Sequence, residues 1–240
     1  MAWVRLNITV EGQTERRFAD DLLTPHLAEL EIEVKPRVVV TNRKLGKRGG
    51  IRGFDSIRQD IIRLLRSDRA PEARFTTMMD LYALPNTFPG WATAAKMTTP
   101  TTRVAALEAA LAKDIGDARF IPYIQLHEFE ALLCSDLSEL ARRLSGSAQA
   151  LGRLTDEVAA LTPEEINEGA ATAPSKRIIR HVAAYEDQKV RVGASAAAAI
   201  GLVQLRAKCP HFNEWVGKLE SLALDQSDLA ETSNPFSQLE

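Results

Sequence analysis

Five acidic residues stand where strands are predicted to end and helices to begin: Glu11, Glu15, Asp80, Glu128 and Glu130. The apolar, β-branched run from Val4 to Val10 ends at Glu11-Gly12, and Glu15 follows where a helical pattern begins. Asp80 ends a second β-prone run, and Glu128 and Glu130 follow a third. Because the carboxyl ends of parallel strands meet at one edge of a sheet, we expect these acids to converge there.

Such a group of carboxylates is suited to metal chemistry. Like charges in one crevice repel, and Mg²⁺ or Mn²⁺, which prefer oxygen ligands, relieve that repulsion. Two such ions can activate water and stabilise the leaving oxygen in phosphodiester cleavage. The alternative is structural, since polar residues are common in loops and Glu15 and Glu128 could simply favour helix N-termini. His127 is a candidate acid–base group, although a single histidine at a strand–helix junction is more often structural.

The elements that would position these acids follow from the hydrophobic pattern. Strands are predicted over 3–10, 32–40, 74–80 and 119–126, and helices over 14–30, 54–67 and 102–115, with a loop over 41–53. From residue 128 on the pattern is helical, with breaks at Gly146, Pro163, 169–174 and Pro210. We therefore expect an α/β fold with a mainly parallel, Rossmann-like sheet covered by helices on both faces. The predicted domains are an α/β domain over 1–135 and a helical extension over 136–240 packed on it.

Composition limits the function classes. The 240 residues can bury one full core, and a net charge of −2 gives no overall positive excess for nucleic-acid binding. Cys134 and Cys209 have no metal-binding spacing and are typical of buried thiols in a reducing compartment. No signal-peptide pattern and no run of about 18 apolar residues occurs. We expect a soluble, cytoplasmic protein.

A local basic segment offers a different route to nucleic acid. Between Glu33 and Asp55 there are seven positive charges and no acid: Lys35, Arg37, Arg43, Lys44, Lys47, Arg48 and Arg52. Interleaved glycines suit a loop that follows a phosphate backbone, so Arg43, Lys44, Lys47, Arg48 and Arg52 are the predicted nucleic-acid contacts. A solvated surface loop is the alternative.

Several motifs carry a family resemblance. VEGQTE, MMDLYALPNTFPGW, IQLHEFEALLCSD, the APSKRI segment and CPHFNEW together resemble an uncharacterised bacterial family of the Toprim clan. That clan includes topoisomerases, primases, recombination proteins and nucleases of the overcoming-lysogenization-defect type. The resemblance covers nearly the whole chain. It implies a Toprim fold in which a glutamate after the first strand and a D-x-D motif after a later strand bind Mg²⁺.

The match implies particular roles and contains one departure. Glu11 matches the glutamate and Asp80 the first aspartate, but Tyr82 occupies the position of the second aspartate, so a metal ligand is missing unless Glu128 or Glu130 supplies it. Nuclease-type members use a lysine to stabilise transition-state charge, for which Lys176 is the candidate and Lys189 the reserve.

The resemblance leads to a functional hypothesis. We expect a Mg²⁺- or Mn²⁺-dependent DNA endonuclease with Glu11, Asp80 and Lys176 as catalytic residues. Relatives imply a partner ATPase of the ABC or SMC type encoded nearby, with a role in phage defence or repair. RNA as the substrate stays open. The alternative, favoured by Tyr82, is a non-catalytic subunit that binds and regulates an ATPase.

Overall fold

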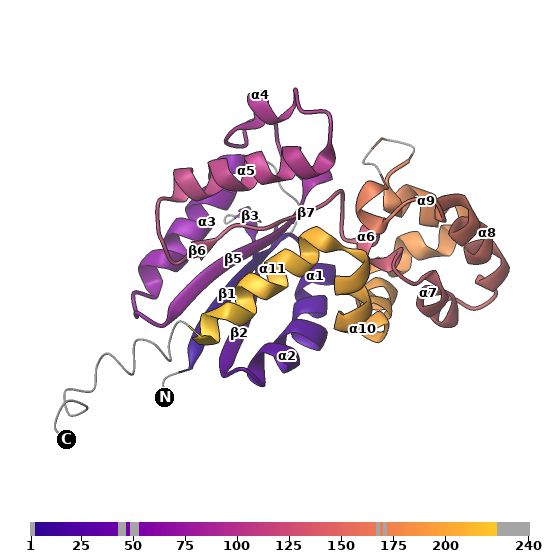
Figure 1. Cartoon of the computed structure of the whole chain (residues 1–240), viewed down its shortest axis with the longest axis horizontal. Helices are drawn as coiled ribbons and strands as arrows, with labels where there is room; N and C mark the ends of the chain where they lie inside the picture. The colour runs from indigo at the N-terminus through magenta and orange to yellow at the C-terminus, as the bar shows by residue number, and fades with distance from the viewer. Residues whose placement is uncertain (1–2, 43–46, 49–52, 167–168, 170–171, 225–240) are drawn as a thin grey trace, which may run out of the picture.

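A parallel sheet forms the centre of the molecule. In the computed structural model, which describes residues 3–42, 47–48, 53–166, 169 and 172–224, the strand order is β2-β1-β5-β6, and β7 also pairs with β5. All of these pairings are parallel. The carboxyl ends of the strands point toward the part of the molecule formed by α6 to α10 (Figure 1).

The first half of the described chain alternates strands and helices. Its elements are β1 (Val4–Val10), α1 (Gln13–Phe18), the π-helical η1 (Ala19–Leu23), α2 (Thr24–Ala28), β2 (Ile32–Val38), β3 (Val40–Asn42), β4 (Lys47–Arg48), α3 (Phe54–Ser67), β5 (Ala73–Asp80), the 3₁₀ turn η2 (Leu81–Ala83), α4 (Trp91–Ala94), α5 (Pro100–Ile115), β6 (Phe120–Ile121) and β7 (Ile124–Gln125).

The second half is helical. It comprises α6 (Glu130–Leu133), α7 (Leu137–Arg143), α8 (Ala148–Val158), η3 (Pro163–Glu165), α9 (Pro174–His181), η4 (Ala183–Gln188), the π-helical η5 (Lys189–Gly193), α10 (Ala194–Lys208), α11 (Pro210–Glu220) and η6 (Ser221–Ala223).

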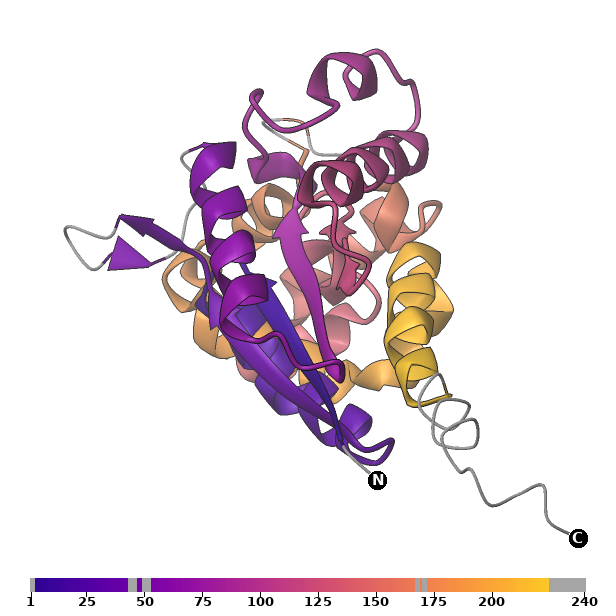
Figure 2. The same ribbon diagram turned by 90° about the vertical axis from the view of Figure 1, so that its left-hand side faces the viewer.

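The sheet buries an apolar layer on each face. On one face, β1 side chains such as Leu6 pack with Phe18 of α1 and with residues of α10 and α11. On the other face, Phe75 and Met79 of β5 pack against α3 and α5. Figure 2 shows α3 and α5 on one side of the strands and α11 on the other. The almost uninterrupted burial of β1 and β5 is what a parallel sheet covered on both faces requires.

The C-terminal helices return to the sheet through α11. The Trp215 indole stacks on Tyr123 with ring centroids 4.1 Å apart, and its Nε1–H donates to Thr76 Oγ1 of β5. The buried Glu164 side chain accepts hydrogen bonds from the His211 and Phe212 amides in the first turn of α11. These contacts satisfy the free N–H groups of a helix start and fix α11 on the sheet.

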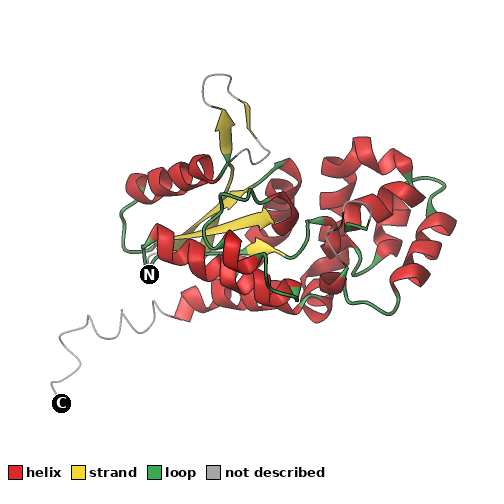
Figure 3. Cartoon of the chain, turned by 90° about the horizontal axis from the view of Figure 1, so that it is seen from above, coloured by secondary structure: helices red, strands yellow, loops and turns green. Residues whose placement is uncertain are grey.

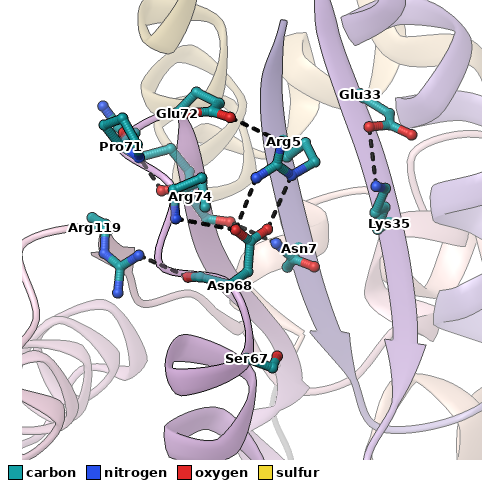
Figure 4. Close-up of polar contacts among 12 residues, drawn as sticks. Arg5, Asn7, Glu33, Lys35, Ser67, Asp68, Pro71, Glu72, Arg74 and Arg119 are labelled. Atoms are coloured by element: carbon teal, nitrogen blue, oxygen red, sulfur yellow. Dashed lines mark hydrogen bonds and ion pairs between the residues drawn. The ribbon is translucent and has the colours of Figure 1, made fainter.

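A charged cluster closes the opposite, amino end of the sheet. Figure 4 shows the Arg5 guanidinium of β1 between Asp68 and Glu72, which it contacts at 2.8 and 3.0 Å. Arg119 donates to the Asp68 carbonyl and lies over the Phe75 ring. The pKa of Asp68 is lowered chiefly by its hydrogen bonds with Arg5. These acids are paired with cations, in contrast to those at the carboxyl end.

The predicted α/β class, with a mainly parallel sheet, helices on both faces and C-terminal helices, is confirmed. Two local predictions were wrong. The strand predicted over 119–126 is divided into β6 and β7, because Pro122 lacks the N–H that a ladder needs. Thr77 bridges the break, since its Oγ1 accepts from the Tyr123 amide and donates to the Tyr123 carbonyl.

The second error concerns the predicted loop over 41–53. Part of it is an antiparallel ribbon, since β3 pairs with β4, and Figure 3 shows this ribbon projecting from the rest of the protein. Lys47 and Arg48 form β4, whereas Arg43, Lys44 and Arg52 lie outside the described residues. No helix in the described ranges has the length and apolar character needed to cross a membrane. The division of the chain near residue 135 stays a prediction.

An ion network joins α8 to α9 and leads to a prediction about pH. Glu157 accepts from Arg177, Arg180 and His181, and these cations lower its pKa to about 2. A lowered folded-state pKa contributes stability above the unfolded value of about 4.5, and this contribution is lost as pH falls toward 2.

Glu157→Gln should therefore lower the melting temperature at pH 7 by about 2–4 °C, equivalent to about 1 kcal/mol for a partly exposed pair. The difference from wild type should disappear between pH 4.5 and 2 in thermal melts followed by circular dichroism. Equal melting temperatures at pH 7 would show that the network does not stabilise the fold. Glu214→Gln, at an exposed acid of α11 that has no ion pair among the described residues, is the control for loss of a charge.

Candidate metal centre at the carboxyl edge of the sheet

Glu11 and Glu15 flank the turn between β1 and α1. Gly12 is the residue before the helix, and hydrogen bonds from the Gly12 and Glu15 amides favour the ionised Glu15 carboxylate. This is the return contact of a glutamate three residues after a helix cap. A Cβ atom on Gly12 would lie 3.0 Å from Glu15 Oε2, so glycine permits this close approach. Glu15 is consequently buried at the start of α1.

Asp80 lies beside Glu11 because β1 and β5 are hydrogen-bonded neighbours. The Asp80 amide donates to Glu11 Oε2 at 3.4 Å. Asp80 Oδ1 is buried and has no hydrogen-bond partner among the described residues. A buried carboxylate oxygen without a partner is costly, and in a functional site it is the expected state of a ligand awaiting a cation.

Glu128 and Glu130 are presented by an unusual turn after β7. His127 adopts a left-handed φ of 62°, which costs energy for a residue with a side chain. Two contacts hold it there: its Nε2 bonds the Glu164 carbonyl at 2.9 Å, and its own carbonyl accepts from the Tyr82 amide at 2.8 Å. Both glutamates are buried, and Glu128 accepts a short hydrogen bond from the Ser175 amide. His127 thus has a structural contact that accounts for its burial.

The C-terminal helices supply polar partners for Glu130. Its Oε1 lies 3.4 Å from Lys189 Nζ and accepts from the Tyr185 hydroxyl at 3.3 Å. Tyr185 is completely buried. A Cβ atom on Gly193 would come within 2.8 Å of the Tyr185 oxygen, so glycine leaves the room that the phenol needs. Glu130 is therefore oriented by residues more than fifty positions away.

The five acids influence one another electrostatically. Burial, followed by Glu15, Glu128 and Glu130 charges, raises the pKa of Glu11 to about 7. Burial and the Glu128 charge raise the pKa of Glu130 to about 7, partly offset by Lys189. Burial and the other four acids hold the pKa of Asp80 well above its usual range. A cluster with this much uncompensated negative charge favours a cation.

The donor set fits a hard divalent ion. All five side chains offer carboxylate oxygens, which suit Mg²⁺ and Mn²⁺, and Asp80 Oδ1 is already without a partner. Within the described ranges, no three His, Cys, Asp or Glu side chains are placed to hold a metal ion as they stand. Side-chain rotation about the fixed strand ends would be needed to form the shell.

The five predicted acids therefore lie in one cluster. Of the two predicted lysines, only one contacts an acid of this cluster. Lys176 is exposed on the first turn of α9, next to Ser175, and makes no ion pair among the described residues. Lys189, the reserve candidate, contacts Glu130, and its charge partly offsets the rise that burial causes in the pKa of Glu15. Tyr185 and Gly193 were not predicted, because no sequence motif links them to Glu130. The roles assigned to all these residues stay predictions.

Comparison with known protein families identifies the family to which the chain belongs. A family described as "Domain of unknown function (DUF4276)" matches residues 10–220, and the chain belongs to this family. No curated protein shows a significant match.

Solved structures with similarity to this chain include two C-terminal regions of OLD proteins. The C-terminal region of the Burkholderia pseudomallei OLD protein is 19% identical with a TM-score of 0.44, covering 93% of this chain and 98% of that chain. The C-terminal region of the Xanthomonas campestris pv. campestris OLD protein, phased with platinum, is 18% identical with a TM-score of 0.40, covering 93% and 96%.

The Tyr185 contact yields a prediction about metal affinity. Tyr185→Phe keeps the buried ring but removes the hydroxyl that orients Glu130, so Mn²⁺ should bind about 3- to 10-fold more weakly, the effect of one hydrogen bond. Isothermal titration calorimetry measures this. Tyr123→Phe is the matched control, because Tyr123 is equally buried but its hydroxyl donates to Gln125. Equal Mn²⁺ affinity in Tyr185→Phe and wild type would contradict the orienting role.

Proposed function

We propose that the protein is a metal-dependent endonuclease that hydrolyses DNA phosphodiesters with Mg²⁺ or Mn²⁺. One observation carries the proposal: five carboxylates, three buried and two half-buried, lie at the carboxyl edge of a parallel sheet, and the central one, Asp80, has a buried oxygen without a partner among the described residues. This is the edge at which open α/β sheets bind ligands. A similar group of acids without a ligand would be a poor way to stabilise a fold.

The residues divide into three roles. Glu11, Asp80 and Glu128 would hold the ion or ions, and Glu15 and Glu130 complete the shell. A bound divalent ion would activate water and stabilise the leaving oxygen. Lys189, beside Glu130, is the cation in contact with the carboxylates, and Lys176, exposed next to Ser175, is free to meet a phosphate. Both can offset negative charge that develops on the phosphate.

Other parts of the proposal rest on the sequence. The Toprim-clan resemblance supports a nuclease and a partner ATPase of the ABC or SMC type, with a role in phage defence or repair in the cytoplasm. The basic segment of residues 35–52 supports nucleic-acid binding, with β3 and β4 projecting beside the sheet. RNA as the substrate stays an alternative to DNA.

A second candidate function is a non-catalytic subunit that regulates an ATPase. Tyr82 favours it, because a tyrosine replaces the second aspartate of the D-x-D motif. Metal binding separates the two functions: the regulatory subunit requires no metal, whereas the nuclease requires one.

Loss of either central acid should abolish cleavage. Glu11→Gln and Asp80→Asn are nearly isosteric but remove a ligand, so plasmid nicking with Mg²⁺ or Mn²⁺ should fall by at least about 100-fold. Asp114→Asn, an acid of α5 that pairs with Arg58, is the control and should keep full activity. Assays should include the cognate ATPase. Full activity of Glu11→Gln would exclude the mechanism.

The same variant should change stability with a definite sign. The raised pKa of Glu11 means that its protonated form stabilises the metal-free fold below about pH 4.5, and that this stability is lost as pH rises through about 7. At pH 8 without metal, the melting temperature of Glu11→Gln should therefore be higher than that of wild type. Added Mn²⁺ should reverse the order, because only wild type has the full ligand set.

The two lysines should differ in what they affect. Lys189→Ala removes the cation beside Glu130 and should change both Mn²⁺ affinity and cleavage. Lys176→Ala should lower cleavage and preserve Mn²⁺ affinity, because its ammonium contacts none of the acids. Calorimetry with Mn²⁺ and nicking rates for both variants test this. Normal cleavage by Lys176→Ala would remove that lysine from the mechanism.

A further inference from the structure

Tyr82 is an exposed aromatic residue at the carboxyl edge of the sheet. Its side chain is 47% exposed, and it follows Asp80 by two residues, in the turn after the central strand β5. Among the described aromatic side chains, only Trp3 is as exposed, and Trp3 precedes β1 at the amino end of the sheet. The other rings are buried or half-buried. An exposed ring beside a buried acidic cluster is available to a ligand of that cluster.

Two hydrogen bonds from backbone amides bring the segments of Tyr82 and Lys176 to the same turn. The Tyr82 amide donates to the His127 carbonyl, and the Ser175 amide donates to the Glu128 side chain. His127 is therefore hydrogen-bonded to Tyr82, and the adjacent Glu128 is hydrogen-bonded to Ser175, the residue before Lys176. Lys176 is exposed and has no ion pair in the described part of the chain. An exposed aromatic residue and the residue before an exposed lysine are thus both hydrogen-bonded to the dipeptide of His127 and Glu128.

That combination matches the chemistry of a nucleotide with an unpaired base. An aromatic ring stacks on any nucleobase, and an ammonium contacts the phosphate. We propose that Tyr82 is a stacking platform for an unpaired DNA base next to the phosphate held at the acidic cluster, with Lys176 contacting the backbone. The inference rests on the proposed function and specifies its substrate class as single-stranded or locally opened DNA. A base inside an intact duplex has both faces covered and cannot stack on Tyr82.

Binding without cleavage gives the direct test. Fluorescence polarisation with a labelled oligothymidylate, in Ca²⁺ in place of Mg²⁺, should show Tyr82→Ala binding about tenfold more weakly than wild type. Tyr82→Phe, which retains the ring, should bind as wild type does. Trp3→Ala, which removes the equally exposed ring at the other end of the sheet, should also leave affinity unchanged. Blunt duplex DNA should bind Tyr82→Ala and wild type equally.

A change in the DNA supplies the complementary test. Moving a single abasic site along a short oligonucleotide should identify one position where loss of the base weakens wild-type binding about tenfold and leaves Tyr82→Ala unaffected. Equal wild-type and Tyr82→Ala affinities, an equal loss in Trp3→Ala, or a loss in Tyr82→Phe as large as in Tyr82→Ala would each overturn the stacking proposal. So would a wild type that binds no oligonucleotide. A wild type that binds with this pattern but cleaves nothing in Mn²⁺ would refute the nuclease and support the stacking site.

Discussion

Mutual repulsion among five carboxylates, three buried and two half-buried, is the constraint on which the arrangement at the carboxyl edge depends. Backbone amides offset part of it, since Asp80 donates to Glu11 and Ser175 to Glu128. Lys189 offsets another part. Burial and the repulsion that remains favour the protonated acids, so the pKa values of Glu11 and Glu130 are raised to about 7. A divalent cation would replace those protons, so metal binding should release protons near neutral pH.

The helical extension is necessary to this balance. The acids come from the first 130 residues, but the groups that orient Glu128 and Glu130 come from residues beyond 170, in α9, η4 and η5. The stack of Trp215 on Tyr123 fixes the extension to the sheet from which the acids project. The candidate site spans the predicted boundary near residue 135, because contacts to Glu128 and Glu130 come from both sides of it. Truncation of the chain near residue 135 would remove Lys189, the cation that contacts Glu130.

Sequence patterns predicted the site as far as local chemistry determines it. The β-branched runs of β1 and β5 fixed where Glu11 and Asp80 fall, and the parallel topology brought them together. A short motif favoured Lys176 over Lys189, but the sequence could not predict that Lys189 contacts Glu130, because this contact depends on how η5 packs against α6. The left-handed His127 was equally unpredictable, since tertiary contacts with Glu164 and Tyr82 hold it. The break between β6 and β7 could have been predicted from Pro122, because proline interrupts a strand ladder.

Tyr82 connects the departure from the D-x-D motif with the electrostatics of the edge. Burial and repulsion from the other four acids already hold the pKa of Asp80 well above its usual range, and a sixth carboxylate at this position would add to that repulsion. Glu128 and Glu130, which β7 presents beside β5, supply acidic oxygens without that aspartate. Under the proposed function, this position is therefore not required for metal binding and can carry a neutral ring. Tyrosine in place of aspartate at position 82 avoids further negative charge and adds an apolar surface on which a substrate base could lie. The replacement is therefore compatible with the proposed nuclease site.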